Sequence, residues 1–237
     1  MDTFKIIRMK YLLSSIIFFC ITKSTSGQIS YQISGTLRNL AKTYIYLNHD
    51  ISKNKIDSVF SENGDFMFNK SSKYPDLLYI SVAGKSGRIP IFVSAGKIHI
   101  EASADSLGRA IVSGSSNHDF FKLVNRADLM GSFTSQEVTD YRKAVSSKDT
   151  VLQQSITKKV NERTTVAKKI MDSLLNRNPS SHVWSHHLAS IRSFPNNPDH
   201  MKRLWEMYKR LARTVRKDDN GKLFVSNYKK AISSIRK

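Results

Sequence analysis

The chain has 237 residues with 38 lysines and arginines against 19 aspartates and glutamates, so its formal net charge is +19 at pH 7. Hydrophobic residues make up 40% of the sequence and charged residues 24%, which is typical of a globular protein and unlike a disordered or collagen-like chain. The single cysteine excludes an internal disulfide and a cysteine-rich zinc site.

Residues 1–27 have the pattern of a signal peptide. Basic residues precede a mainly apolar run over residues 11–21, and this run is about half of the roughly 20 residues that a transmembrane helix needs. The small residues Thr25 and Gly27 favour cleavage before Gln28. The sequence therefore predicts export to the periplasm or cell envelope.

Two points about this leader stay open. Cys20 would carry a lipid if the protein were a lipoprotein, but Phe18 and Phe19 stand where a lipoprotein signal needs small residues. Otherwise Cys20 belongs to the apolar signal core and leaves with it, so that the mature chain has no thiol. Translation starts either at Met1 or at Met9.

Residues 28–118 show short alternating apolar runs separated by turn residues, which is the pattern of antiparallel strands. The Asn63-Gly64 pair predicts a hairpin, because both residues accept a positive φ. About seven or eight strands at this spacing predict a β-sandwich or a partly open barrel. The strands are expected near residues 31–37, 44–48, 56–60, 66–68, 77–82, 89–93, 98–102 and 110–112.

Residues 119–237 change to helical spacing, so the predicted fold class is α+β, with a helical lobe after the β-domain. Thr134 and Glu137 form a candidate capping box. One helix is expected over 151–178 and another after Asn197-Pro198. The expected buried stripes are Ile156, Val160, Ala167, Ile170 and Leu174; Val183, Trp184, Leu188 and Ile191; Leu204, Tyr208, Leu211 and Val215; and Phe224, Tyr228, Ala231 and Ile235.

No motif in the sequence identifies a reaction. His182 and His186 have the i, i+4 spacing of a zinc site, but the glutamate of a His-Glu-x-x-His motif is absent. We therefore expect His182, His186 and His187 on a partly exposed helix face, with Trp184 and Leu188 turned inward. Residues 84–87 are expected to form a hairpin loop rather than a phosphate loop, and residues 113–116 a turn that ends a strand. The sequence predicts no catalytic residue, no cofactor and no metal site.

The helical half carries most of the positive charge, with 24 of the 38 basic residues in 119–237. Such a field attracts polyanions, and the alternative is a solvated surface whose charges are screened beyond about 10 Å at 0.1 M salt. In an exported protein the available anions would be lipid or lipopolysaccharide head groups, acidic glycans or an acidic protein, and no nucleic acid is expected. The candidate anion-binding residues are Lys202, Lys209, Arg210, Arg213 and Arg216.

The order of short motifs in the β-region resembles an uncharacterised domain, domain of unknown function 4369, of exported proteins of the Bacteroidetes. That domain commonly precedes a thioredoxin-like domain of the disulfide-reductase or peroxiredoxin type. The motifs are Ile33-Ser34-Gly35-Thr36-Leu37, Ile45-Tyr46-Leu47, Ile56-Asp57-Ser58-Val59, Asn63-Gly64-Asp65-Phe66, Pro75-Asp76-Leu77-Leu78-Tyr79, Phe92-Val93-Ser94-Ala95-Gly96 and Val112-Ser113-Gly114-Ser115.

The departure from this pattern limits what the resemblance implies. Thioredoxin chemistry needs a Cys-x-x-Cys pair, and the only cysteine here lies in the predicted leader. We therefore expect a non-catalytic binding or scaffolding module of the envelope, accessory to a redox partner, with an unknown protein or an envelope polyanion as its ligand. The alternatives are a fragment of a thiol-disulfide oxidoreductase that has lost its catalytic domain and a polyanion-binding protein that uses the basic helices.

Overall fold

The computed structural model describes residues 28–49, 55–191 and 197–235. The predicted leader, including Cys20, lies outside these residues. Within the described part of the chain, none of the helices combines the length and apolar character needed to cross a membrane.

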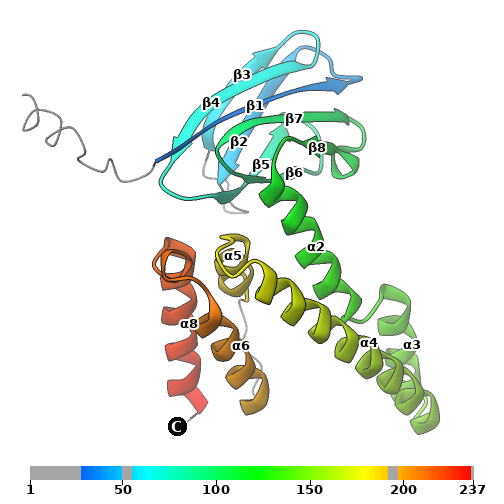
Figure 1. The fold of residues 1–237 in the computed structure, drawn as a ribbon. Helices are drawn as coiled ribbons and strands as arrows, with labels where there is room; N and C mark the ends of the chain where they lie inside the picture. The colour runs from blue at the N-terminus through cyan, green and yellow to red at the C-terminus, as the bar shows by residue number, and fades with distance from the viewer. Residues whose placement is uncertain (1–27, 50–54, 192–196, 236–237) are drawn as a thin grey trace, which may run out of the picture.

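Two four-stranded sheets form the amino-terminal half (Figure 1). Sheet A has the strand order β4-β1-β7-β8, and sheet B has the order β3-β2-β5-β6. The strands are β1 (Ile29–Arg38), β2 (Thr43–His49), β3 (Lys55–Ser61), β4 (Asp65–Ser72), β5 (Asp76–Val82), β6 (Ile89–Val93), β7 (Gly96–Ser103) and β8 (Ile111–Ser113), with a short 3-10 helix, η1 (Leu107–Arg109), before β8. The predicted α+β class and the sandwich are confirmed, and the sheets do not close into a barrel.

The sandwich core comes from alternate residues of each strand. Ile33 and Leu37 of β1 and Ile45 and Leu47 of β2 are fully buried between the sheets, as their alternation predicts. Gly35 lies where β1 passes closest to β7, since an added Cβ would stand 2.3 Å from the Ile100 carbonyl oxygen. Only glycine fits this approach.

The predicted hairpin at Asn63-Gly64 is wrong, and of the two residues Gly64 alone takes the positive φ that the prediction allowed for both. Gly64 has a φ of 94°, but the turn connects β3 of sheet B to β4 of sheet A, and β4 pairs with β1 instead. The Leu37 N–H donates to the Gly64 carbonyl at 2.9 Å. The local sequence specifies the turn, whereas the pairing partner depends on contacts far along the chain.

The strands are antiparallel with one exception. β1 and β7 are parallel neighbours in the middle of sheet A, because the chain crosses from β6 in sheet B to β7 in sheet A. The prediction of a purely antiparallel domain is wrong for this pair. The loop 84–87 does join the antiparallel strands β5 and β6 as a hairpin, as predicted.

The helices follow directly, since β8 ends at Ser113 and the first α-helix starts at Ser116. They extend away from one end of the sandwich, and α8 ends on the side far from the sheets (Figure 1). They are α2 (Ser116–Met130), α3 (Ser135–Ser146), α4 (Thr150–Arg177), α5 (Val183–Ala189), α6 (Pro198–Arg210), α7 (Arg213–Arg216) and α8 (Asp219–Ile235).

Local capping signals place the helix ends as predicted. Thr134 and Glu137 form a reciprocal capping box at the start of α3, and the Asn197 side chain caps α6 by accepting from the His200 N–H at 3.1 Å. Glu137 also accepts from Arg163 of α4 at 2.6 Å. The hydrogen bonds from Arg163 and from the Thr134 backbone lower the pKa of Glu137 to about 2, so one carboxylate both caps α3 and holds it on α4.

Two predicted helical stripes differ from the structure. On α4, Ile170 is exposed and the buried face continues through Met171 and Leu175, because the helical repeat drifts over 28 residues. The stripe from Leu204 to Val215 is not one helix. Leu211 has extended backbone angles, so α6 ends at Arg210 and α7 is a separate turn.

The two halves are joined through the outer face of sheet B. Leu77 of β5 and Phe92 of β6 point away from the sandwich core and are buried with Phe121, Trp184 and other helical residues in a second apolar cluster. Part of sheet B is therefore covered on both faces. This explains why residues 77–82 and 89–93 are almost continuously apolar rather than alternating.

Side chains at the amino end of α2 also hydrogen-bond to backbone groups on the edge of β6 that faces away from β5. The Ser115 hydroxyl donates to the Phe92 carbonyl at 2.8 Å, and the Phe92 N–H donates to His118 Nδ1 at 3.4 Å. Pro90, two residues earlier on this edge, has no N–H to leave unpaired. Side chains of α2 and its cap thus occupy the backbone groups of Phe92 on the β6 edge of sheet B, which discourages pairing with another chain there.

We predict that His118 makes the fold sensitive to acid. Burial lowers the pKa of His118 to about 4 from a usual 6.5, helped by Lys122 and opposed by Asp119. Between pH 6.5 and pH 4 the unfolded chain therefore binds a proton that the folded chain does not, and stability falls as the pH falls. His118→Asn should make the unfolding free energy less dependent on pH in this interval, by a slope that corresponds to at most one proton. Urea unfolding at several pH values between 4 and 6.5 measures this slope. His99→Asn, at an exposed position on β7, is the control, and equal slopes for His118→Asn and the wild type would contradict the assignment.

Candidate binding site

The predicted anion-binding residues do not form one continuous helical flank. Because α6 ends at Arg210, helical spacing does not relate Lys202 and Lys209 to Arg213 and Arg216. Lys209 pairs with Glu206 at 2.8 Å. The binding of an anion by the candidate residues stays a prediction.

Arg210 is engaged in holding α6 on α4. It donates to Asp172 at 2.9 Å and to the Asn176 side-chain oxygen at 2.6 Å, while Arg203 donates to Asp172 at 3.1 Å. Burial raises the pKa of Asp172, but the hydrogen bonds and charges of the two arginines outweigh it and lower the pKa overall. Both guanidinium groups therefore have a structural role here.

A buried carboxylate that sequence reasoning missed organises the helical half. Asp218 caps α8, because its Oδ1 accepts from the Gly221 N–H at 2.6 Å. Its Oδ2 accepts from the Ser185 hydroxyl at 2.6 Å and lies 2.6 Å from His182 Nδ1. We call Asp218, Ser185 and His182 together the Asp218 clasp. It ties α5 to the start of α8 with a residue that is 2% exposed.

The Asp218 clasp contains the residue types of a serine hydrolase in an arrangement that does not activate the serine. Hydrolase chemistry needs the serine hydroxyl to donate to the imidazole, which then donates to the acid. Here Ser185 and His182 both contact the same carboxylate oxygen, and Ser185 is fully buried. The geometry fits a structural clasp.

We predict that the clasp is a main source of stability in the helices. Asp218→Ala removes a helix cap and the buried carboxylate that Ser185 and His182 share, and leaves the Ser185 hydroxyl with the His182 carbonyl as its acceptor, which should cost about 3 kcal/mol. The matched control is Asp219→Ala at the next, exposed position, where a change within about 0.5 kcal/mol is expected. Urea denaturation compares the two variants, and equal stabilities would rule out the clasp as a stabilising element.

The histidines His182, His186 and His187 are partly exposed, as predicted, although each has neighbours that the sequence does not indicate. Trp184 and Leu188 are buried as predicted, but His182 is in the clasp and His186 lies edge-on to the rings of Phe92 and Phe121. Among the described residues, histidine, cysteine, aspartate and glutamate side chains nowhere gather in a group of three suited to a metal ion.

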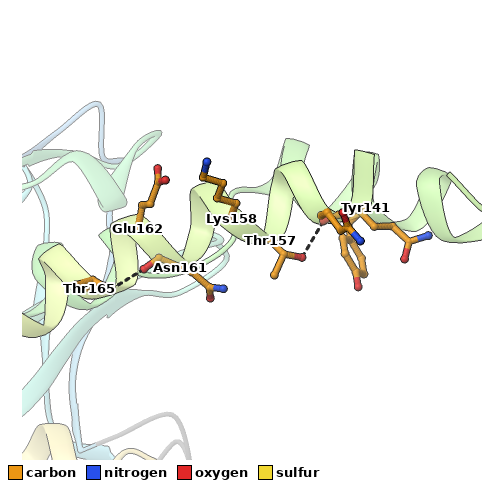
Figure 2. Close-up of a pocket in the computed structure, with 8 residues that line it drawn as sticks. Tyr141, Thr157, Lys158, Asn161, Glu162 and Thr165 are labelled. Atoms are coloured by element: carbon orange, nitrogen blue, oxygen red, sulfur yellow. Dashed lines mark hydrogen bonds between the residues drawn. The ribbon is translucent and has the colours of Figure 1, made fainter. Parts of the chain in front are cut away.

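A polar groove of about 550 Å³ runs along α4 beside Tyr141 of α3. The hydroxyls of Thr157 and Thr165 donate to backbone carbonyls of α4 itself, at 2.8 and 2.9 Å. Figure 2 shows Lys158 and Glu162 on one side of the helix and Asn161 on the other. These side chains do not converge on one point, so the groove is a poor candidate for a ligand site.

The outer face of sheet B is a better candidate. Strand register places Phe60 beside Tyr44, Tyr46 between Ser58 and Ser81, and Asn48 between Lys55 and Tyr79. All these side chains point away from the sandwich core, since their strand neighbours Ile45 and Leu47 point into it. We call this surface the aromatic face. It comprises Tyr44, Tyr46, Phe60 and Tyr79 with Lys55 and Arg88.

The aromatic rings are ordered against one another. Tyr44 and Tyr46 are nearly parallel, with an angle of 8° and ring centres 6.3 Å apart, and Phe60 meets Tyr44 edge-on at 5.2 Å. Tyr44 and Phe60 are each 49% exposed. Two large apolar side chains are therefore held in place at the surface without being covered by the protein.

Two cations and two polar side chains accompany the rings. Lys55 Nζ lies 5.0 Å from the centre of the Tyr46 ring, and the Arg88 guanidinium carbon lies 4.3 Å from that of Tyr79. The Asn48 side chain donates to the Ser81 hydroxyl at 2.8 Å. Such a surface can stack on the flat or apolar faces of a ligand while attracting negative charge. The signal for this surface in the sequence is the pair of aromatic residues, Tyr44 and Tyr46, at the outward positions of β2.

Comparison with known protein families finds a match for one part of the chain. Residues 31–121 match the family model described as Domain of unknown function (DUF4369). The match covers the two sheets and the first turns of α2, and it leaves the later helices outside. Searches of curated proteins and of solved structures found no match.

Proposed function

Because residues 31–121 carry a domain of unknown function (DUF4369), we propose from the surface of this domain that the chain is an exported, non-catalytic binding module of the bacterial cell envelope. Its ligand is an acidic glycan, and the aromatic face of sheet B is the surface that binds it. Export is supported by the leader pattern of residues 1–27. The single observation that carries the proposal is the pair of ordered, half-exposed rings Tyr44 and Phe60 beside Lys55.

The exposed rings supply the first part of the argument. Leaving large apolar side chains in water gives up about 1.5–3 kcal/mol each relative to burial, and clustered exposed rings commonly mark a binding surface. A sugar ring presents a face of C–H groups that packs flat on an aromatic ring. The spacing of Tyr44, Tyr46 and Phe60 across two strands suits an extended chain of such rings.

Charge supplies the second part. Lys55 and Arg88 flank the rings, and the chain from residue 28 onward has 34 basic and 18 acidic residues, a net charge of +16, so an anionic polymer is attracted before contact. Asn48 and Ser81 offer hydrogen-bonding groups between the two cations. An acidic glycan has the three matching properties: C–H faces, carboxylate or sulfate groups, and hydroxyls.

We propose a non-catalytic module because the serine, histidine and aspartate side chains that could react are engaged in structural hydrogen bonds. The serine, histidine and aspartate that come together in the described residues do so in the Asp218 clasp, where both acid oxygens are occupied. Other buried groups, such as His118, contact backbone of the neighbouring strand. A binding role uses the surface and leaves these contacts intact.

We predict that the full chain binds immobilised heparin and polygalacturonate and does not bind neutral dextran. Retention should survive about 0.5 M salt, because ring stacking is not screened by ions. The double variant Tyr44→Ser, Phe60→Ser should lose at least about tenfold in affinity, which corresponds to about 1.4 kcal/mol. Met67→Ser, at a 53% exposed position on the outer face of sheet A, is the matched control.

Two outcomes would contradict the proposal. If the double variant binds as the wild type does while Lys202→Ala with Arg213→Ala weakens retention, the basic helices are the anion-binding surface. If single-stranded DNA binds the aromatic face more tightly than either glycan, the ligand class is wrong, because bases stack on aromatic rings in the same way.

A further inference from the structure

A second concave surface lies in the helical half, away from sheet B. A cleft of about 490 Å³ opens where α2, α4, α5 and α6 meet. This volume falls in the range of small-molecule sites, about 300–1,000 Å³. The cleft shares no residue with the aromatic face, so inferences about it stand independently of the proposed function.

The floor of the cleft is apolar. It is formed by side chains that belong to the buried helical core, and these leave a hollow rather than filling it. Two methionines among them have flexible, polarisable side chains that adapt to the shape of an apolar group. The floor residues are Ala127, Ala167, Met171, Leu204 and Met207.

The rim of the cleft is charged with opposite signs on different helices. Asp128 comes from α2 and Lys168 from α4, and in the described part of the chain no ion pair involves either side chain. Arg203 of α6 also lines the cleft, although it is paired with Asp172. An acidic group and a basic group thus remain available at the mouth of one apolar hollow.

Two imidazoles, those of His187 and His200, also line the cleft. Burial lowers the pKa of His187, with Asp128 opposing the shift. Burial also lowers the pKa of His200, followed by the positive charges of Lys168 and Arg203. Both rings are therefore neutral at pH 7, and each can donate one hydrogen bond and accept another. Asp128 raises the pKa of both histidines and Lys168 lowers that of His200, so groups of both charges act on the imidazoles that line the cleft.

From this arrangement we propose that the cleft binds a small zwitterion with an apolar side chain, that is, a free apolar amino acid. The ammonium group is held by Asp128 with His187, the carboxylate by Lys168 with His200, and the side chain lies on the methionine and leucine floor. A ligand of one charge only would leave the opposite rim group without a partner.

The test is calorimetric titration of the full chain with three probes that share one apolar body. These are L-leucine, 4-methylpentanoate, which lacks the ammonium group, and 3-methylbutylamine, which lacks the carboxylate. L-Leucine should bind saturably, with a Kd of about 1 mM or tighter. Each single-charge analogue should bind about threefold to fivefold more weakly, because the lost ion pair involves a solvent-exposed rim group.

Variants identify the groups involved. Asp128→Asn should weaken L-leucine about threefold to fivefold and leave 4-methylpentanoate unchanged, whereas Lys168→Met should weaken both acids and leave the amine unchanged. Lys169→Met, at the adjacent exposed position of α4 that does not line the cleft, should bind L-leucine as the wild type does. Asp128 and Lys168 are exposed, so folding is expected to persist, and circular dichroism checks it for each variant.

The proposal is overturned if L-leucine does not bind. It is equally overturned if 4-methylpentanoate binds as tightly as L-leucine and Asp128→Asn has no effect, since the cleft would then recognise an anionic amphiphile. These outcomes are separate from those for the aromatic face, because the glycan experiment uses variants on sheet B.

Discussion

The packing of helices on the outer face of β5 and β6 is the interaction on which the rest of the structure depends. Leu77 and Phe92 are sheet residues, yet they are buried with Trp184 and Phe224 of the helices rather than with the sandwich core. A sheet with one face on a core and the other in water would expose them. The helices are therefore needed to complete sheet B, and sheet B is needed to complete the helical core.

This constraint also decides which surfaces stay open. The helices cover sheet B at Leu77 and Phe92 and leave the strands farther from α2 and α5 uncovered, where Tyr44 and Phe60 stand half-exposed. The cleft between α2, α4, α5 and α6 lies within the same helical assembly that the Asp218 clasp holds together. Both candidate binding surfaces thus follow from how the two halves are joined.

The sequence predicts the local features well because local physics determines them. The capping residues Thr134 and Asn197 act within one helical turn, and the alternation around Ile33 and Ile45 reflects the two-residue repeat of a strand. Strand partners are not local. Gly64 makes the turn that its sequence requires, but only the completed sandwich determines that β4 pairs with β1 rather than with β3.

The candidate sites were largely missed for a related reason. Asp218 stands in a run of charged residues that looks exposed, and its burial results from α5 and α8 meeting. The end of α6 at Arg210 separates basic residues that a helical repeat would align. The continuous apolar runs of β5 and β6 were the one available sign of two-sided burial, and the outward aromatics of β2 the one sign of the aromatic face.

Native-state hydrogen exchange tests most directly whether the two halves form one cooperative unit. Amides at the centres of β5, β6 and α5 should exchange only through global unfolding, so their opening free energies should agree and should fall in parallel as urea is added. Amides of α5 that open at a clearly lower free energy than those of β6, with a separate urea dependence, would show that the helices unfold while the sandwich stays folded, and would contradict the account.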